Sequence, residues 1–203
     1  MIRTFLAVEL DDALRRDVAE LQRDLKAALG PGQIGRARIS WPQPASMHLT
    51  LKFYGDIDER LVDPLQVAIA AAVSATRGLD VPFERLGAFP RPDEPRVLWV
   101  GASHTWERGD AGRRLAALHQ AIEDASLTLG FPPEGRPFSP HLTLGRIRSG
   151  ERPVGRALVQ SGALNRTVAI GSIGVASIAC LKSDLRPDGP VHTKLWEVRL
   201  TGT

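Results

Sequence analysis

His48-Leu49-Thr50-Leu51 is a four-residue sequence that the chain repeats unchanged as His141-Leu142-Thr143-Leu144. Two of the five histidines of the chain therefore stand in the same context. Alternating polar and apolar residues are typical of a β-strand, in which successive side chains point to opposite faces. We therefore expect each histidine to share a face with its threonine, about 7 Å along the strand, while the leucines face the core.

The paired imidazole and hydroxyl groups favour proton transfer at a negatively charged centre. Imidazole gives or takes a proton near neutral pH, and a hydroxyl can donate a hydrogen bond to an anionic oxygen. In-line displacement at phosphorus needs two proton-transfer groups on opposite sides of the phosphorus atom. We predict His48 and His141 as this acid and base, in an order the residues leave open, and Thr50 and Thr143 as phosphate ligands.

With their flanks, the two motifs resemble the 2H phosphoesterase superfamily, and within it the bacterial RNA 2′,3′-cyclic phosphodiesterases, also called 2′-5′ RNA ligase-like proteins. The resemblance covers nearly the whole chain. Beyond the motifs it includes Arg3-Thr4-Phe5-Leu6-Ala7-Val8, Phe89-Pro90-Arg91, Arg96-Val97-Leu98-Trp99-Val100-Gly101, Phe138-Ser139-Pro140 with Gly145-Arg146, and Leu181-Lys182-Ser183-Asp184-Leu185.

This resemblance implies an enzyme that hydrolyses the 2′,3′-cyclic phosphate at an RNA end to a 2′-phosphate, without a metal or other cofactor. It implies that His48 is the proton donor and His141 the proton acceptor. It also implies an α+β fold of two pseudo-symmetric lobes, each an antiparallel sheet backed by helices, with the active cleft between them. Residues 1–203 are expected to form one bilobal domain, with the internal duplication marked by the motifs at 48–51 and 141–144.

Arg146 ends the second motif strand, and the resemblance gives it a place on the substrate phosphate. Strict alternation puts Arg146 on the face opposite His141, so a bulge or a strand end has to turn it inward. The same rule puts Lys52 on the face of His48, either as a solvated strand end or as a further phosphate contact.

Other candidates lie in loops and near the carboxy-terminus. Arg91 and Arg96 flank a loop that the resemblance places near the cleft, although solvated loop arginines are about as common. His192 stands where the relatives commonly carry an aromatic residue, so its role is open. His104 and His119 are expected at the surface. Trp41, Phe53 and Phe89 could stack on a nucleobase, but packing in the core is the first interpretation for each of them.

The composition is ordinary for a soluble globular protein, with 203 residues, 43% of them apolar and 24% charged. A net charge of +3 and a pI near 9.5 fit an anionic partner such as RNA. The single cysteine, Cys180, excludes an internal disulfide and is expected in a buried strand. We expect a cytoplasmic monomer with no obligate partner and no membrane association, since no secretory signal or spanning segment is visible.

Two other functions stay open. One is the reverse reaction, which joins RNA ends through a 2′-5′ linkage with the same groups. The other is an RNA-end or nucleotide-binding module without turnover, which would have no need of histidine and threonine in both motifs. The chain has no Gly-rich phosphate loop of the Gly-x-x-x-x-Gly-Lys-Ser/Thr kind.

The pattern along the chain predicts a mixed fold, in which strand, helix, motif strand and helix follow one another in both halves. Asp11 or Asp12 is expected to cap the first helix, which ends at Gly30. The other predicted helices are 56–73, bent at Pro64 or beginning there, 106–129 and 154–160. The predicted strands are 4–10, 79–86, 96–101, 140–148, 168–170, 173–181 and 194–200, with a loop at 33–43.

Overall fold

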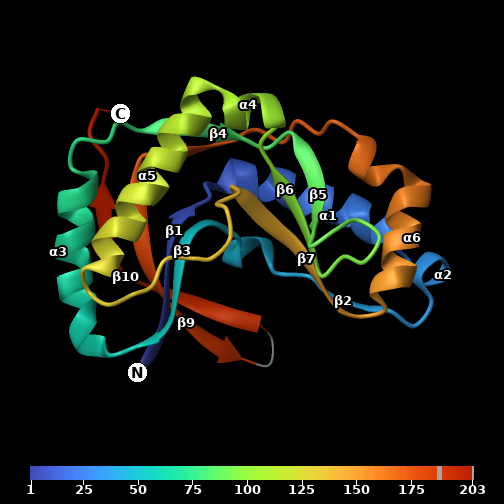
Figure 1. Ribbon diagram of the computed structural model, residues 1–203. Coiled ribbons are helices and arrows are strands. Elements are labelled where there is room, and N and C mark those ends of the chain that lie inside the picture. Colours follow the sequence, from blue (N-terminus) through green and yellow to red (C-terminus); the bar gives the residue numbers. More distant parts are fainter. Residues whose placement is uncertain (187–188, 203) are drawn as a thin grey trace.

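A computed structural model describes residues 1–186 and 189–202 of the chain (Figure 1). Its strands are β1 (Ile2–Glu9), β2 (Arg38–Ser40), β3 (His48–Ile57), β4 (Leu79–Pro82), β5 (Arg85–Phe89), β6 (Val97–Gly101), β7 (His141–Ser149), β8 (Ser172–Val175), β9 (Ser177–Arg186) and β10 (Gly189–Arg199). Its helices are α1 (Asp12–Ala28), α2 (Pro31–Ile34), α3 (Val62–Val73), α4 (His104–Arg108), α5 (Asp110–Leu127) and α6 (Glu151–Ser161), with short 3₁₀ turns η1 (Pro44–Ser46), η2 (Glu59–Leu61) and η3 (Ala163–Asn165).

Two antiparallel sheets of four strands form the two lobes. The first has the order β10-β9-β1-β3 and the second β2-β7-β6-β5, while β4 and β8 make a separate pair. Figure 1 shows α3 and α5 beside the first sheet, and α1, α2 and α6 beside the second. The predicted α+β fold of two helix-backed antiparallel lobes is therefore confirmed, and each lobe contains one of the two motif strands.

The first helix shows how the sequence fixes these elements. The Asp11 side chain accepts a hydrogen bond from the backbone N–H of Leu14 at 2.7 Å, which caps α1. Apolar residues then recur every three or four positions, and those at Leu14, Val18 and Leu25 are buried. Burial of each such side chain contributes about 2 kcal/mol relative to exposure, so this stripe holds α1 against the core.

Five sequence-based assignments need correction. The segment 168–170 is not a strand. The N–H groups of Val168 and Ile170 donate to the carbonyls of Glu84 and Phe83, but these bonds do not extend into a ladder. The predicted strands at 79–86 and 173–181 each divide into two, since the chain passes from the β4–β8 pair into a larger sheet. The loop at 33–43 contains β2 and part of α2. The helix at 56–73 starts with η2, capped by Asp58, and Pro64 lies in the first turn of α3.

The first motif strand contains a β-bulge inside the motif itself. On β1, Ala7 pairs with Thr50 and the preceding Leu6 pairs with Lys52, so Leu51 is the extra residue on β3. A bulge interrupts the alternation of faces. As a result Leu51 and Lys52 are both buried, at 2% and 1% exposure, although they are neighbours in the strand.

The second motif strand contains the same irregularity at the same motif position. Trp99 pairs with Thr143 and Leu98 pairs with Gly145, so Leu144 is the extra residue on β7. Leu144 and Gly145 are both buried, as their counterparts in β3 are. The bulge also turns Arg146 to the side of the sheet that carries Thr143, which meets the requirement set out from the sequence.

Candidate active site

The four motif side chains lie as the alternation predicts. Leu49 and Leu142 are fully buried in the main core. The two histidines and the two threonines of the motifs are only partly buried. Each motif therefore presents an imidazole and a hydroxyl on the face of its sheet that points away from the main core.

Both histidine rings are held in the same tautomer by their own backbone. Nδ1 of His48 lies 2.9 Å from the carbonyl oxygen of Ser46, and Nδ1 of His141 lies 2.8 Å from that of Ser139. A carbonyl oxygen only accepts, so Nδ1 must be the protonated, donating nitrogen in each ring. The neutral ring therefore carries its lone pair on Nε2, which has no hydrogen-bond partner among the described residues.

Burial and positive neighbours make both histidines hard to protonate in the free protein. Burial lowers the pKa of His48 to about 4, and the charges of His192, Arg146 and His141 act in the same direction. Burial and the charge of Arg146 likewise lower the pKa of His141. Because Arg146 acts on both rings, the two motifs share one electrostatic environment that favours an anion between them.

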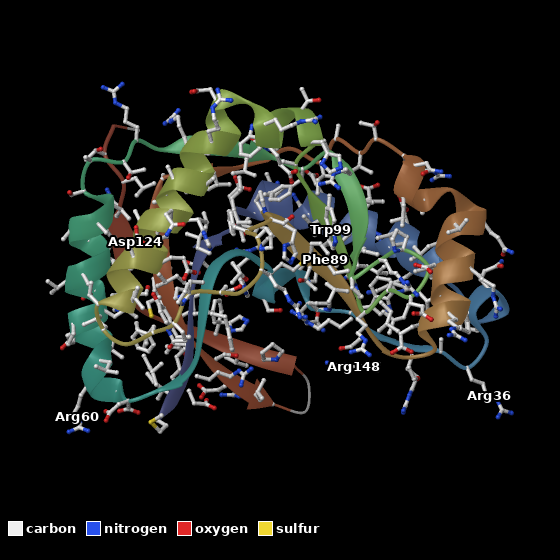
Figure 2. All side chains as sticks on the ribbon, in the orientation of Figure 1. Arg36, Arg60, Phe89, Trp99, Asp124 and Arg148 are labelled. Atoms are coloured by element: carbon white, nitrogen blue, oxygen red, sulfur yellow. The ribbon has the colours of Figure 1, made fainter. Side chains whose placement is uncertain are left out.

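Aromatic rings pack against each histidine. The ring of His48 stacks on Phe5 at 4.4 Å between centroids, and His192 meets it edge-on at 5.2 Å. Around His141 the corresponding neighbours are Phe89, edge-on at 5.2 Å, and the indole of Trp99 at 6.2 Å. Figure 2 shows Phe89 and Trp99 together on the second sheet. His192 therefore packs beside the histidine of the first motif and not beside that of the second.

A cleft of about 1280 Å³ opens beside the second motif. Its lining includes Thr50, His141, Thr143 and Arg146, so it joins residues of both lobes. Most of the lining belongs to the second sheet and the segments next to it: the β5–β6 loop, residues 134–139, β7 and the start of α6. His48 does not line the cleft, although Thr50 on the same face of β3 does. The predicted cleft therefore lies mainly on the side of the second sheet.

The remaining candidates separate into two groups. Arg96 lines the cleft and has no ion pair among the described residues. Arg91 lies outside the lining and pairs with Asp93 at 3.1 Å and with Glu94 at 2.7 Å. Phe53 also lies outside it, 43% exposed, with the guanidinium of Arg3 over its ring at 4.7 Å.

Lys52 is neither solvated nor a phosphate contact. Its Nζ donates to Glu123 Oε2 at 2.7 Å and to the carbonyl of Pro132 at 3.1 Å, in a buried ion pair with side-chain exposures of 1% and 5%. The bulge at Leu51 directs this side chain into the core, where its charge requires a partner. No sequence pattern had indicated Glu123, which lies on α5 far along the chain.

The ion pair holds one wall of the cleft, which we define as residues 131–139. Glu123 Oε2 also accepts from the backbone N–H of Glu134 at 3.3 Å, and Glu134 in turn accepts from the N–H of Phe53 at 3.3 Å. The ring of Tyr54 packs on Phe131, 4.7 Å between centroids. In Figure 1 this segment passes beside β3 on its way to β7. The strand of the first motif thus positions the segment that leads into the second.

His119 is not the surface residue that the sequence suggested. Only 12% of its side chain is exposed, its ring stacks on Phe138 at 4.1 Å, and its Nε2 lies 3.5 Å from Glu123 Oε1. Burial lowers its pKa, while Glu123 and the backbone of Leu51 counteract this shift. The opposite lobe shows a similar contact: Gln22 on α1 donates to the carbonyl of Leu144 at 3.0 Å. Each bulged leucine is therefore contacted by a helix of the other half of the chain.

Neither a metal-ligand cluster nor a membrane-spanning helix is present among the described residues. Over residues 1–186 and 189–202, no group of three or more His, Cys, Asp or Glu side chains is arranged to hold a metal ion. No helix in this described part of the chain is long and apolar enough to cross a membrane. Cys180 is buried, as expected, and burial raises the pKa of its thiol to about 12.

The two-lobed fold and the repeated histidine motif are those of the 2H phosphoesterases. Residues 8–99 and 108–192 match the LigT like Phosphoesterase family, and the chain belongs to that family. It is 31% identical to the RNA 2′,3′-cyclic phosphodiesterase of Methanothermobacter thermautotrophicus over 98% of this chain and 99% of that protein. It is 37% identical to the RNA 2′,3′-cyclic phosphodiesterase of Aeropyrum pernix over 76% of this chain and 82% of that protein.

Solved structures share the fold at lower sequence identity. A protein of Thermus thermophilus superposes with a TM-score of 0.70 at 24% identity, covering 99% of both chains. Escherichia coli LigT in complex with 3′-AMP gives a TM-score of 0.68 at 22% identity, again over 99% of both chains. The two-lobed architecture therefore extends over the whole chain.

Proposed function

We propose that this protein is an RNA 2′,3′-cyclic phosphodiesterase, which opens a terminal 2′,3′-cyclic phosphate by water and leaves a 2′-phosphate. The observation that carries the proposal is the matched pair of imidazoles, His48 and His141. Each comes from a different sheet, and each is oriented by its own backbone with Nε2 free. The names of the relatives support the substrate class.

In this proposal the substrate phosphate lies between the two motif strands. Thr50 and Thr143 donate hydrogen bonds to its non-bridging oxygens, and Arg146 meets the negative charge that grows on them. The two motif strands place these donors on the same cleft before the substrate arrives, so little reorganisation is needed in the transition state. One histidine takes a proton from the attacking water, and the other gives a proton to the departing 3′ oxygen of the ribose.

We assign the acid to His48 and the base to His141, as the family resemblance implies. The acid has to be protonated at Nε2, which the free site opposes by holding the pKa of His48 at about 4. The anionic substrate reverses this effect, because a negative charge within about 4–6 Å favours the charged form of a titratable group. Binding of the anionic substrate thus raises the pKa of His48 and favours the protonated form that the acid needs.

The role assignment has its own test. In a cyclic phosphate whose 3′ oxygen is replaced by sulfur, the thiolate leaves without needing a proton. This substrate should restore turnover by the His48→Ala variant, which lacks the acid, but not by His141→Ala, which lacks the base. The opposite pattern of rescue would exchange the two roles without affecting the proposed reaction.

The first experiment is hydrolysis of an RNA oligomer ending in a 2′,3′-cyclic phosphate, in the presence of excess chelator. We expect turnover to the 2′-phosphate with a bell-shaped dependence on pH, and a loss of at least about 100-fold in either His→Ala variant. Binding of the oligomer without turnover by the unaltered protein would contradict the hydrolase. That result would favour 2′-5′ ligation or RNA-end binding as the function.

We further propose that the protein acts as a monomer on RNA ends in the cytoplasm. Both motifs, Arg146 and the wall come from the same chain, so the proposed site needs no residue from a partner. Sedimentation at working concentration would test this, and a dimer whose dissociation abolishes turnover would contradict it.

A further inference from the structure

The cleft is larger than the group that reacts in it. Pockets of roughly 300–1,000 Å³ suffice for a drug-sized ligand, which is the size of a nucleotide. The cleft measures about 1280 Å³, and its lining runs from residues 134–139 past His141 to the start of α6. A terminal nucleotide placed on the two motifs therefore leaves part of this space for a second one.

Cationic groups without partners lie along this space. Arg96, Arg136 and Arg146 line the cleft, and none of them forms an ion pair or a side-chain hydrogen bond among the residues that the structure describes. The carboxylate of Glu94, on the same lining, is occupied by Arg91 and Arg152, each at 2.7 Å. Glu134 accepts from the backbone of Phe53, and Glu151 lies at the start of α6.

Phe138 supplies a flat apolar surface among these charges. One face of its ring is covered by His119, with 4.1 Å between centroids and 15° between the planes. Phe138 also lines the cleft, so its remaining exposed surface is available to a ligand. Aromatic rings in RNA-binding sites stack on bases irrespective of sequence.

The wall presents Phe138 and Arg136 in a fixed position. Both belong to the segment that Lys52 and Glu123 hold against the first motif strand, through Pro132 and Glu134. His119, which backs Phe138, comes from the same helix as Glu123. A platform fixed before binding loses little freedom when a base stacks on it.

We propose that Phe138 and Arg136 form a subsite for the second nucleotide of the RNA strand, counted from the reacting end. The base of that nucleotide stacks on Phe138, and Arg136 binds the phosphate that joins it to the terminal nucleotide, while Arg146 serves the reacting phosphate. This inference rests on the proposed function. It identifies the substrate as an oligoribonucleotide of two or more residues rather than a free cyclic mononucleotide.

The unaltered protein provides the first test, with no variant that could fail to fold. We expect kcat/KM for a dinucleotide ending in a 2′,3′-cyclic phosphate to exceed that for the cyclic mononucleotide by about tenfold, the value of one stacked base. A tetranucleotide should add less than this first step does. Equal values for the mononucleotide and the dinucleotide would overturn the subsite.

Variants then locate the effect. Phe138→Ala should remove most of the preference for the dinucleotide over the mononucleotide, Arg136→Met should reduce it, and Phe138→Trp should retain it. Arg136→Met should also flatten the dependence of log kcat/KM on log salt by about 0.7. Arg36→Met is the matched control, because Arg36 is exposed, is not part of the cleft lining, and points outward from the molecule (Figure 2). A preference that survives both cleft variants would contradict the proposal.

Failure of the hydrolase would be distinguishable from failure of the subsite. If no cyclic phosphate is turned over, the same comparison is made by titration of the His141→Ala protein with the mononucleotide and dinucleotide 2′-phosphates. Tighter binding of the dinucleotide, lost in the Phe138→Ala background, would support the subsite without catalysis. Equal affinities for the two ligands would reject it.

Discussion

Arg146 stands in the second motif strand where Phe53 stands in the first. Each lies five positions after its histidine and just beyond a bulged leucine, and each pairs with the neighbouring strand, Arg146 with Val97 and Phe53 with Phe5. The two halves therefore share a backbone plan but place a cation on one side and an aromatic ring on the other. We propose that this plan derives from a duplicated unit whose two copies have since taken different roles.

The asymmetry leads to the first prediction. Arg146→Met should lower kcat/KM by about 100-fold or more, because it removes a charge that meets the transition state. Phe53→Leu, at the equivalent position outside the cleft lining, should have a much smaller effect. Steady-state kinetics with the cyclic-phosphate oligomer checks both, and Arg146→Lys should recover part of the loss. Comparable losses in the Phe53 and Arg146 variants would argue against the assignment.

A second prediction concerns His192, which meets the rings of both His48 and Phe5 edge-on. The groups that act on the pKa of His48 are His192, Arg146, His141 and the carbonyl of Ser46. After burial, the charge of His192 makes the largest contribution to the lowered pKa of His48. His192→Phe keeps a ring in place but removes this charge, so the pKa of His48 should rise.

The measurement is the pH profile of kcat/KM for the His192→Phe variant. Only the limb that follows His48 should move, toward higher pH, while the other limb stays. His192→Ala, which also removes the packing, should lower kcat in addition. If neither limb moves in the Phe variant, His192 has no electrostatic effect on His48.

The sequence was sufficient to predict the parts of the site that repeat. Two identical motifs gave the faces of His48 and His141, and the odd offset of Arg146 from its histidine required a bulge, which the structure contains at Leu144. What depends on contacts between distant segments could not be predicted. The face of Lys52 was wrong because the same kind of bulge, at Leu51, reverses it.

The wall illustrates the same limit. Glu123 and His119 sit on α5 in a pattern that reads as an ordinary amphipathic helix, and only the fold brings them to Lys52 and Phe138. Arg136 and Phe138 do stand close before the second motif in sequence, which was the one available signal for them. The predicted strand at 168–170 was wrong for a related reason, because its apolar residues pack against the core while its hydrogen bonds to Phe83 and Glu84 do not extend into a ladder.

A third prediction tests the buried ion pair. Lys52→Met leaves Glu123 buried beside no cation, and loss of one partner of such a pair costs about 3–5 kcal/mol of the free energy of unfolding. The double variant Lys52→Met with Glu123→Leu should lose less than Lys52→Met alone, because it leaves no uncompensated charge. Urea denaturation of the variants checks this order.

The ion pair also positions the wall, so stability and activity should separate in the double variant. It retains an apolar core but loses the hydrogen bond from Lys52 to the carbonyl of Pro132 and the one from the N–H of Glu134 to Glu123. We therefore expect a higher KM for the RNA oligomer even where the double variant is well folded. An unchanged KM would show that the wall is held without these bonds.

The last prediction is the acid sensitivity of the fold. The folded protein holds the pKa of His48 at about 4, against 6.5 for the unperturbed group. As the pH falls below 6.5 the unfolded chain takes up a proton there that the folded chain refuses until about pH 4. The stabilisation is therefore complete above pH 6.5 and is lost progressively down to pH 4, by about 3 kcal/mol for this one group.

His48→Gln should remove that part of the pH dependence. Between pH 7 and pH 4.5 its free energy of unfolding should fall less steeply than that of the unaltered protein. A residual slope should remain, because burial also lowers the pKa values of His119, His141 and His192. His104→Gln is the control for loss of a histidine outside the site, since this imidazole lies on α4 and is 67% exposed. Equal slopes in His48→Gln and the unaltered protein would mean that His48 is protonated as readily in the folded chain as in the unfolded one, and that burial beside Phe5 and His192 does not keep it neutral.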